Sequence, residues 1–132
     1  MALQACNKTK VLVVDEEVTV RNILSMILRT RLPALDVETA TNGVEALAAF
    51  KKEHHALICM DIRMPLMKGD EAFDQINEFC KTNEWEEPAV VFCTGFALPE
   101  GLKKSIRESA RHTVLYKPLN TNDFLKAVTD RL

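Results

Sequence analysis

Hydrophobic residues occur along this chain in two patterns, short unbroken runs and stretches with helical spacing. The unbroken runs have no polar alternation, which is typical of strands that are buried on both faces of a sheet. A weaker alternation indicates an outer strand at residues 35–40. The runs themselves predict strands at residues 10–14, 56–60, 88–93 and 113–116.

Each predicted strand is followed by a stretch in which apolar residues recur every three or four positions, as on one face of a helix. The first helix should end before Pro33, because the residue before a proline disfavours the helical conformation. Asn42 is a suitable N-cap for the second helix. The fourth helix, expected at residues 98–110, has the thinnest apolar stripe. The apolar faces of the other four expected helices include Val20, Ile23, Leu24, Ile27, Leu28, Val44, Leu47, Ala72, Phe73, Ile76, Phe124 and Val128.

Five strands that alternate with five helices predict an α/β fold with a single doubly wound, five-stranded parallel sheet. In such folds the ligand site lies beyond the carboxyl ends of the strands. The residues at those ends should therefore converge on one rim. They are Asp15 and Glu16 after the first strand, Asp61 after the third, Thr94 at the end of the fourth and Lys117 after the fifth.

The stretch VLVVDEE at residues 11–17 raises the question of what holds several carboxylates together. Two carboxylates about 4 Å apart repel by roughly 4 kcal/mol at an effective dielectric constant near 20. Solvent, a proton or a cation must offset that repulsion. Because acidic, oxygen-rich sites suit hard divalent cations, Mg²⁺ at a site for phosphoryl groups fits best. Asp61 could then be a metal ligand or a nucleophile, with Lys117 and Thr94 stabilising phosphoryl oxygens.

Composition narrows the class of protein further. The chain has 132 residues, 47% of them hydrophobic and 27% charged, which is ordinary for one globular domain. A net charge of -2 gives no electrostatic case for binding nucleic acid or a membrane. The sequence has neither a signal-peptide core nor a run long enough to span a membrane. Its four cysteines lack metal-site spacing, so we expect a cytoplasmic protein with free thiols.

Four short motifs together resemble the receiver domain of two-component response regulators, of the chemotaxis-regulator type. They are VLVVDEE, DIRMP with Gly69 four residues on, FCTG and YKP, in this order at predicted strand ends. The resemblance covers residues 10–132 and leaves residues 1–9 as an N-terminal extension. It implies a flavodoxin-like fold with five βα units and the strand order 2-1-3-4-5.

The resemblance also implies roles for individual residues. Asp61 occupies the position of the phosphoacceptor, and Thr94 and Lys117 occupy those of the residues that hold the phosphoryl oxygens. The peptide bond before Pro118 is implied to be cis. The implied ligands of Mg²⁺, or of Mn²⁺ in its place, are Asp15, Glu16, Asp61 and the backbone carbonyl of Arg63.

As a member of this family, the chain would be a signalling module and not an enzyme, catalysing only its own phosphorylation and dephosphorylation. The phosphoryl group would come from a sensor histidine kinase or a histidine phosphotransfer protein. An output domain or target protein would bind the face formed by the fourth helix, fifth strand and fifth helix. Because Val114 stands where the family usually has an aromatic residue, we expect the signal to pass through the backbone after Thr94, where Gly95 adds freedom.

Two alternatives use the same sequence features. One is a Mg²⁺-dependent phosphohydrolase of the haloacid dehalogenase type, with Asp15 as nucleophile and Glu17 as the second acid. Otherwise Glu17 is interpreted as a charge favoured at a helix start. The other alternative, an FMN-binding flavodoxin, is weaker, since three acids after the first strand would repel a phosphate.

Overall fold

The computed structural model describes residues 3–132 and contains one sheet of five parallel strands. The strand order is β2-β1-β3-β4-β5, which confirms the doubly wound, flavodoxin-like arrangement predicted from the sequence. The strands are β1 (Asn7–Val14), β2 (Asp36–Ala40), β3 (His55–Met60), β4 (Ala89–Thr94) and β5 (His112–Tyr116).

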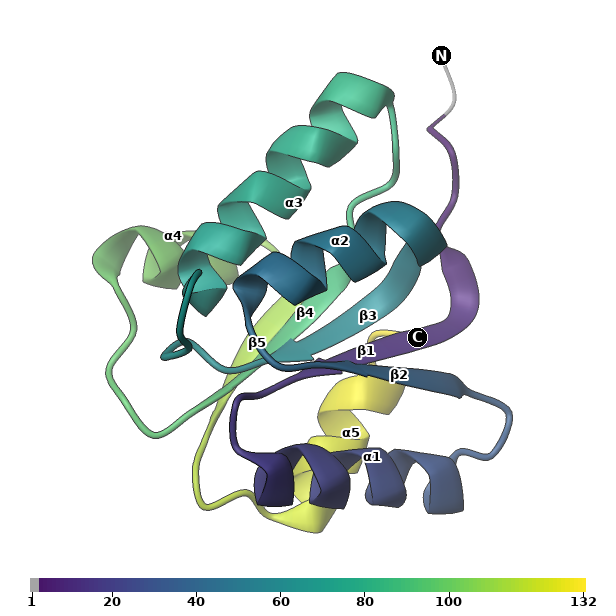
Figure 1. Ribbon diagram of the computed structural model, residues 1–132, viewed down its shortest axis with the longest axis vertical. Coiled ribbons are helices and arrows are strands. Elements are labelled where there is room, and N and C mark those ends of the chain that lie inside the picture. Colours follow the sequence, from purple (N-terminus) through teal and green to yellow (C-terminus); the bar gives the residue numbers. More distant parts are fainter. Residues whose placement is uncertain (1–2) are drawn as a thin grey trace.

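Helices cover both faces of the sheet (Figure 1). One face carries α1 (Val18–Arg31) and α5 (Thr121–Thr129), which bury apolar residues such as Leu28 and Phe124 against the sheet. The other face carries α2 (Gly43–Glu53), α3 (Gly69–Asn83) and α4 (Glu100–Glu108).

A hydrophobic core lies on each face of the sheet. Successive residues of a strand point to opposite faces, so Leu12 contributes to the core under α2, α3 and α4, and Val13 to the core under α1 and α5. All residues of β3 and β4 are buried, which accounts for their unbroken apolar runs. Burying each large apolar side chain contributes about 1.5–3 kcal/mol.

The helix boundaries follow from local chemistry. The side chain of Asn42 accepts a hydrogen bond from the Glu45 N–H at 2.9 Å and caps α2, as predicted. The fourth helix is shorter than residues 98–110, because Pro99 is its N-cap and Ser109 is extended, with φ of -140°. The first strand is longer than predicted and begins at Asn7, which pairs with His55.

The N-terminal segment closes the edge of the sheet at which the parallel strands begin. Gln4 forms a bridge with Trp85: the Gln4 N–H donates to the Glu84 carbonyl at 2.9 Å, and the Glu86 N–H donates to the Gln4 carbonyl at 2.8 Å. The Trp85 ring stacks on the His54 ring with centroids 4.1 Å apart. This part of the chain is therefore held at the opposite end of the strands from the acidic residues.

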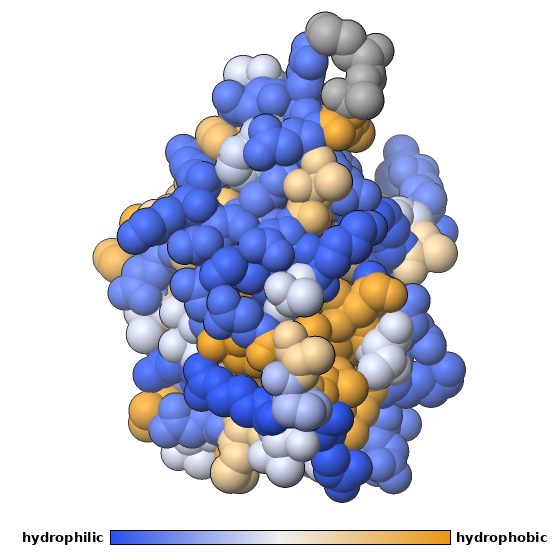
Figure 2. All heavy atoms as spheres, turned by 90° about the vertical axis from the view of Figure 1, so that its right-hand side faces the viewer, coloured by the Kyte–Doolittle hydropathy of each residue, from blue (hydrophilic) through white to orange (hydrophobic). Residues whose placement is uncertain are grey.

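Apolar surface gathers on the side of the molecule next to β2 (Figure 2). In this region a shallow hollow between the α1–β2 loop and the end of α5 is lined mainly by Leu32, Pro33, Ala34, Leu35 and Leu132. Within residues 3–132 no helix is long and apolar enough to cross a membrane.

Candidate functional site

The carboxyl ends of β1, β3, β4 and β5 meet at one edge of the sheet. Asp15 follows β1 and Asp61 follows β3, and both side chains are buried. Thr94 is the last residue of β4 and is fully buried, and Lys117 follows β5. The parallel sheet thus brings together four of the residues that the sequence placed on the rim.

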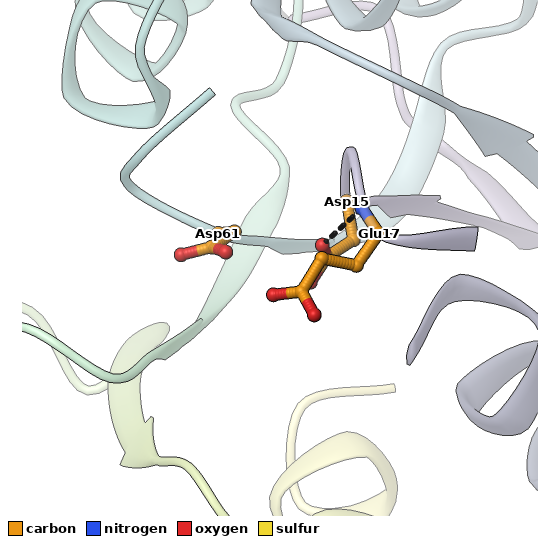
Figure 3. Close-up of side chains that lie close together, drawn as sticks. All are labelled: Asp15, Glu17 and Asp61. Atoms are coloured by element: carbon orange, nitrogen blue, oxygen red, sulfur yellow. Dashed lines mark hydrogen bonds between the residues drawn. The ribbon is translucent and has the colours of Figure 1, made fainter. Parts of the chain in front are cut away.

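Three carboxylates lie close together at this edge (Figure 3). Asp15, Glu17 and Asp61 each offer an oxygen atom, and these atoms lie within 4.8 Å of one another. Oδ1 of Asp15 accepts a hydrogen bond from the Glu17 N–H at 2.9 Å. This bond turns the chain back on itself after β1, so the Glu17 carboxylate lies over the two buried ones.

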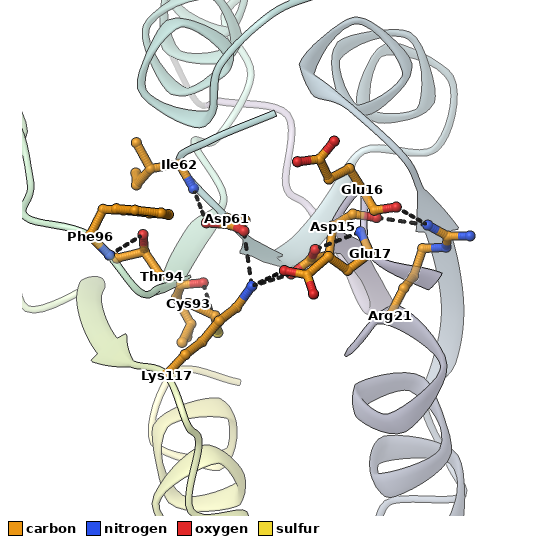
Figure 4. A network of polar contacts seen from close by, with 11 residues as sticks. Asp15, Glu16, Glu17, Arg21, Asp61, Ile62, Cys93, Thr94, Phe96 and Lys117 are labelled. Carbon is orange, nitrogen blue, oxygen red and sulfur yellow. Dashed lines mark hydrogen bonds and ion pairs between the residues drawn. The ribbon is translucent and has the colours of Figure 1, made fainter. Parts of the chain in front are cut away.

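The Lys117 ammonium lies between the buried carboxylates (Figure 4). Its Nζ donates to Oδ2 of Asp15 and to Oδ2 of Asp61, both at 2.9 Å, and lies 3.7 Å from Oε1 of Glu17. Three carboxylates and one ammonium leave two net negative charges at the site. The site therefore retains an excess of negative charge after Lys117 has been paired.

Burial and pairing act together on the titration of this group of residues. Burial alone would lower the pKa of Lys117, but hydrogen bonds to Asp15 and Asp61 outweigh it and raise this pKa. Burial raises the pKa of Asp15, and the bonds from Lys117 and the Glu17 N–H oppose the rise only in part. The pKa of Lys117 is thus raised by its carboxylate partners, whereas the pKa of Asp15 is raised by burial.

The backbone around Asp61 is tightly constrained. Asp61 Oδ1 accepts a hydrogen bond from the Ile62 N–H at 2.6 Å, and the Gly69 N–H donates to the Ile62 carbonyl at 2.8 Å. A Cβ atom at residue 69 would overlap the carbonyl oxygen of Asp61. Glycine is therefore required at position 69 for the loop after β3 to close against the acidic residue.

The β4 side of the site is formed by Thr94, Phe96 and Arg63. Oγ1 of Thr94 accepts a hydrogen bond from the Phe96 N–H at 3.2 Å, which leaves its own hydrogen free to donate. The Arg63 guanidinium lies over the Phe96 ring, 4.0 Å from its centroid. The Lys117 N–H donates to the Thr94 carbonyl at 2.8 Å, so β4 and β5 hold these residues in register.

The positions of the Glu16 and Glu17 side chains differ from those expected from the sequence. The close group of carboxylates contains Glu17, which the sequence analysis interpreted mainly as a helix-start charge, and does not contain Glu16. Glu16 is exposed, and its carboxylate points away from Lys117 (Figure 4). The signal for Glu17 was its position two residues after Asp15, because an aspartate often bonds the backbone N–H two residues on.

Two further expectations concern the residues around Lys117. The Lys117–Pro118 peptide bond is cis, as the resemblance implied. Val114 is half-buried and packs against the core under α4, whereas Tyr116 is exposed. Val114 and Tyr116 are two residues apart and share one face of β5, whereas Leu115, between them, packs against the core under α1 and α5.

Comparison with known proteins agrees with this architecture. Residues 11–129 match the family model described as the response regulator receiver domain. The chemotaxis protein CheY of Halobacterium salinarum is 32% identical over 123 residues, which cover 93% of this chain and 96% of that protein. The transcriptional regulatory protein ResD of Bacillus subtilis is 42% identical over 72 residues, which cover 54% of this chain and 29% of ResD.

Solved structures show the same fold. The chemotaxis response regulator CheY4 of Vibrio cholerae superposes with a TM-score of 0.74 at 29% identity, covering 96% of this chain and 100% of that one. A CheY-like receiver domain protein of Methanospirillum hungatei gives a TM-score of 0.78 at 24% identity, covering 95% and 94% of the two chains.

Fold and site together define a signalling domain of two-component systems, with an acidic group of residues at the carboxyl edge of a five-stranded parallel sheet. The chain belongs to the response regulator receiver domain family. The comparisons give no support to the alternative of a haloacid-dehalogenase-like phosphohydrolase with Asp15 as nucleophile.

Proposed function

We propose that Asp61 accepts a phosphoryl group from a sensor histidine kinase or a histidine phosphotransfer protein. The observation that carries this proposal is the shared Lys117 ammonium, which lies 2.9 Å from oxygens of both Asp15 and Asp61. A carboxylate of this site can attack phosphorus only if nearby positive charge offsets the negative charge of the incoming group. Lys117 supplies such charge next to Asp61.

The proposed transfer forms one bond and breaks one bond. An Asp61 carboxylate oxygen forms a bond to phosphorus while the bond from phosphorus to the donor histidine nitrogen breaks. The electron pair of the broken bond stays on that nitrogen. Because the other ring nitrogen of the donor carries a proton, the products are an acyl phosphate on Asp61 and a neutral imidazole on the donor. Lys117 stabilises the negative charge on the phosphoryl oxygens, and the Thr94 hydroxyl, which has its hydrogen free, donates to one of them.

The donor atoms present suit a hard divalent cation. The candidate ligands are all oxygens, Asp15 and Asp61 are buried, and the site has two net negative charges. When bound, Mg²⁺ would neutralise the surplus charge and polarise a phosphoryl oxygen. Asp15, Asp61, Glu16 and the backbone carbonyl of Arg63 would hold it, with Mn²⁺ able to take its place. Glu17 is not included among these ligands, because it pairs with Lys117: its Oε1 lies 3.7 Å from the Lys117 Nζ.

The signal would reach an output domain or target protein through the face of α4, β5 and α5. This face lies beside Thr94, because Thr94 pairs with Tyr116 in the ladder between β4 and β5. Val114 offers no aromatic ring that could rotate toward Thr94. We therefore assign the coupling to the backbone that follows Thr94.

Labelling with a small phosphodonor tests the proposal. Incubation with acetyl phosphate and Mg²⁺ should add one acid-stable, base-labile phosphoryl group, detectable by intact mass, and Asp61→Asn should abolish it. Asp15→Asn is the comparison variant, and because Asp15 is a proposed Mg²⁺ ligand, this change should slow labelling without abolishing it. If Asp15→Asn abolishes labelling and Asp61→Asn does not, Asp15 is the nucleophile and the proposal is wrong.

A further inference from the structure

Exposed apolar side chains surround the acidic site. Among residues 3–132, nine large hydrophobic residues are exposed, and five of them lie where the chain leaves the carboxyl ends of the strands. A solvated acidic site does not need apolar neighbours, so this arrangement points to a contact surface. The five residues are Val18, Val44, Leu66, Phe96 and Tyr116.

Leu66 is the most exposed of the nine, at 83%, and its backbone is strained. Its φ is 67°, and the Met67 N–H donates to the Pro65 carbonyl at 2.7 Å across it. Together these features form a three-residue γ-turn of the rare form with positive φ. A bulky side chain is disfavoured in this conformation, where asparagine and glycine are tolerated.

The turn is held rigidly next to the site. The Gly43 N–H at the start of α2 donates to the Met67 carbonyl at 3.0 Å, and the Gly69 N–H donates to the Ile62 carbonyl at 2.8 Å. These bonds place Leu66 between two fixed points on the loop that follows Asp61. Leu66 does not contribute to either hydrophobic core, so core packing does not explain its presence.

We propose that Leu66 is the apolar anchor onto which the phosphohistidine-bearing donor protein docks, an inference that rests on the proposed function of Asp61. Asp61 is only 5% exposed, so a donor histidine must reach past the rim while the donor surface lies against it. A phosphoryl group approaching this acidic rim is repelled by it. The exposed side chain of Leu66 can supply binding free energy that the carboxylates of the rim do not, so we expect apolar side chains next to the donor histidine.

The experiment compares a protein donor with a small one. The protein donor is the kinase that labels the wild-type chain fastest in a panel of histidine kinases autophosphorylated with ³²P, used below saturation. The small donor is acetyl phosphate. The variants are Leu66→Asn, which removes the apolar group and suits positive φ, and Leu66→Met, which keeps it. Leu3→Asn is the matched control, because Leu3 is 59% exposed at the opposite edge.

Leu66→Asn should slow transfer from the kinase by about tenfold, which corresponds to the loss of one good apolar contact. Leu66→Met and Leu3→Asn should transfer at the wild-type rate. Labelling by acetyl phosphate should be equal in all four proteins. The melting temperature of Leu66→Asn should equal or exceed that of the wild type, because the strain is relieved.

Other results would overturn the proposal. If acetyl phosphate fails to label the wild type, the proposed function of Asp61 fails. If acetyl phosphate labels all four proteins and kinase transfer to Leu66→Asn is undiminished, or no kinase of the panel labels the wild type, the docking proposal alone fails. A lower melting temperature of Leu66→Asn would make Leu66 a structural residue. Wild-type self-association in gel filtration that Leu66→Asn abolishes would assign the loop to contact with a second copy of the chain.

Discussion

At the scale of single residues, the site depends on how one ammonium is shared. Lys117 donates to Asp15 and Asp61 at 2.9 Å, and its side chain is only 19% exposed. Lys117→Met would leave both carboxylates buried without their cation. Breaking a fully buried pair costs about 3–5 kcal/mol. Because Lys117 retains some exposure, we expect a loss of about 1–3 kcal/mol in the free energy of unfolding at neutral pH, measured by urea titration.

The control for this prediction is Lys103→Met. Lys103 forms an exposed ion pair with Glu100 within α4, so its replacement should cost no more than about 0.5 kcal/mol.

The pH dependence of stability tests the ion pairs of Lys117 independently. The pKa of Lys117 is raised in the folded chain above its ordinary value of 10.5. Its contribution is therefore present in full below pH 10.5 and is lost as the pH rises further. A wild-type advantage over Lys117→Met that persists unchanged at higher pH would contradict the shared ion pair.

Asp15, Asp61, Thr94 and Lys117 could be predicted from the sequence because the carboxyl ends of parallel strands meet at one edge. Each of them directly follows or ends an apolar run, so its position depends only on the sheet. The place of Glu17 could not be predicted in this way. It depends on one hydrogen bond, from the Glu17 N–H to Asp15, and on where α1 starts.

At the scale of elements, α4 is the helix with the fewest buried residues. Leu102 is its only buried residue, and its N-cap, Pro99, provides no side-chain hydrogen bond. We expect α4 to exchange its amide hydrogens faster than the other four helices. Addition of beryllofluoride, which mimics the phosphoryl group, should change protection mainly between residues 94 and 110. Hydrogen exchange with mass spectrometry measures both effects, with α1 as the internal reference.

Protection changes centred on α2 would show that this signalling face is misassigned.

The bounds of α4 could not be predicted from the sequence as well as those of the strands. A thin apolar stripe indicated a helix but could not locate its ends, because only Leu102 is fully buried and Ile106 is buried in part. Strands β3 and β4 were predicted to within a residue, since every residue in them is buried.

At the scale of the whole molecule, binding of a cation should be linked to folding. The folded chain collects carboxylates that are far apart in the unfolded chain, so the proposed Mg²⁺ should bind the folded state preferentially. At a concentration about 100 times the dissociation constant, it should stabilise the fold by about 2.7 kcal/mol. For a domain of this size that raises the melting temperature by roughly 10 °C, measurable by calorimetry.

A pair of variants separates the two glutamates in this measurement. Glu16→Gln should reduce the Mg²⁺-dependent rise in melting temperature, and Glu17→Gln should leave most of it intact. Both variants remove one negative charge from an exposed side chain after β1, so the general electrostatic change is matched. A larger effect from Glu17→Gln would make Glu17 the ligand, as its position beside Asp15 and Asp61 would allow.

The stack of Trp85 on His54 determines what an optical measurement of this protein would report. Trp85 is the sole tryptophan of the chain, and it is fixed between the N-terminal bridge and α2, at the far end of the strands from Asp61. Its intrinsic fluorescence should change sharply on unfolding, when the stack is lost. Phosphorylation, which acts at the other edge, should leave the emission unchanged. Kinetics of activation would therefore need a second fluorophore, whereas kinetics of folding would not.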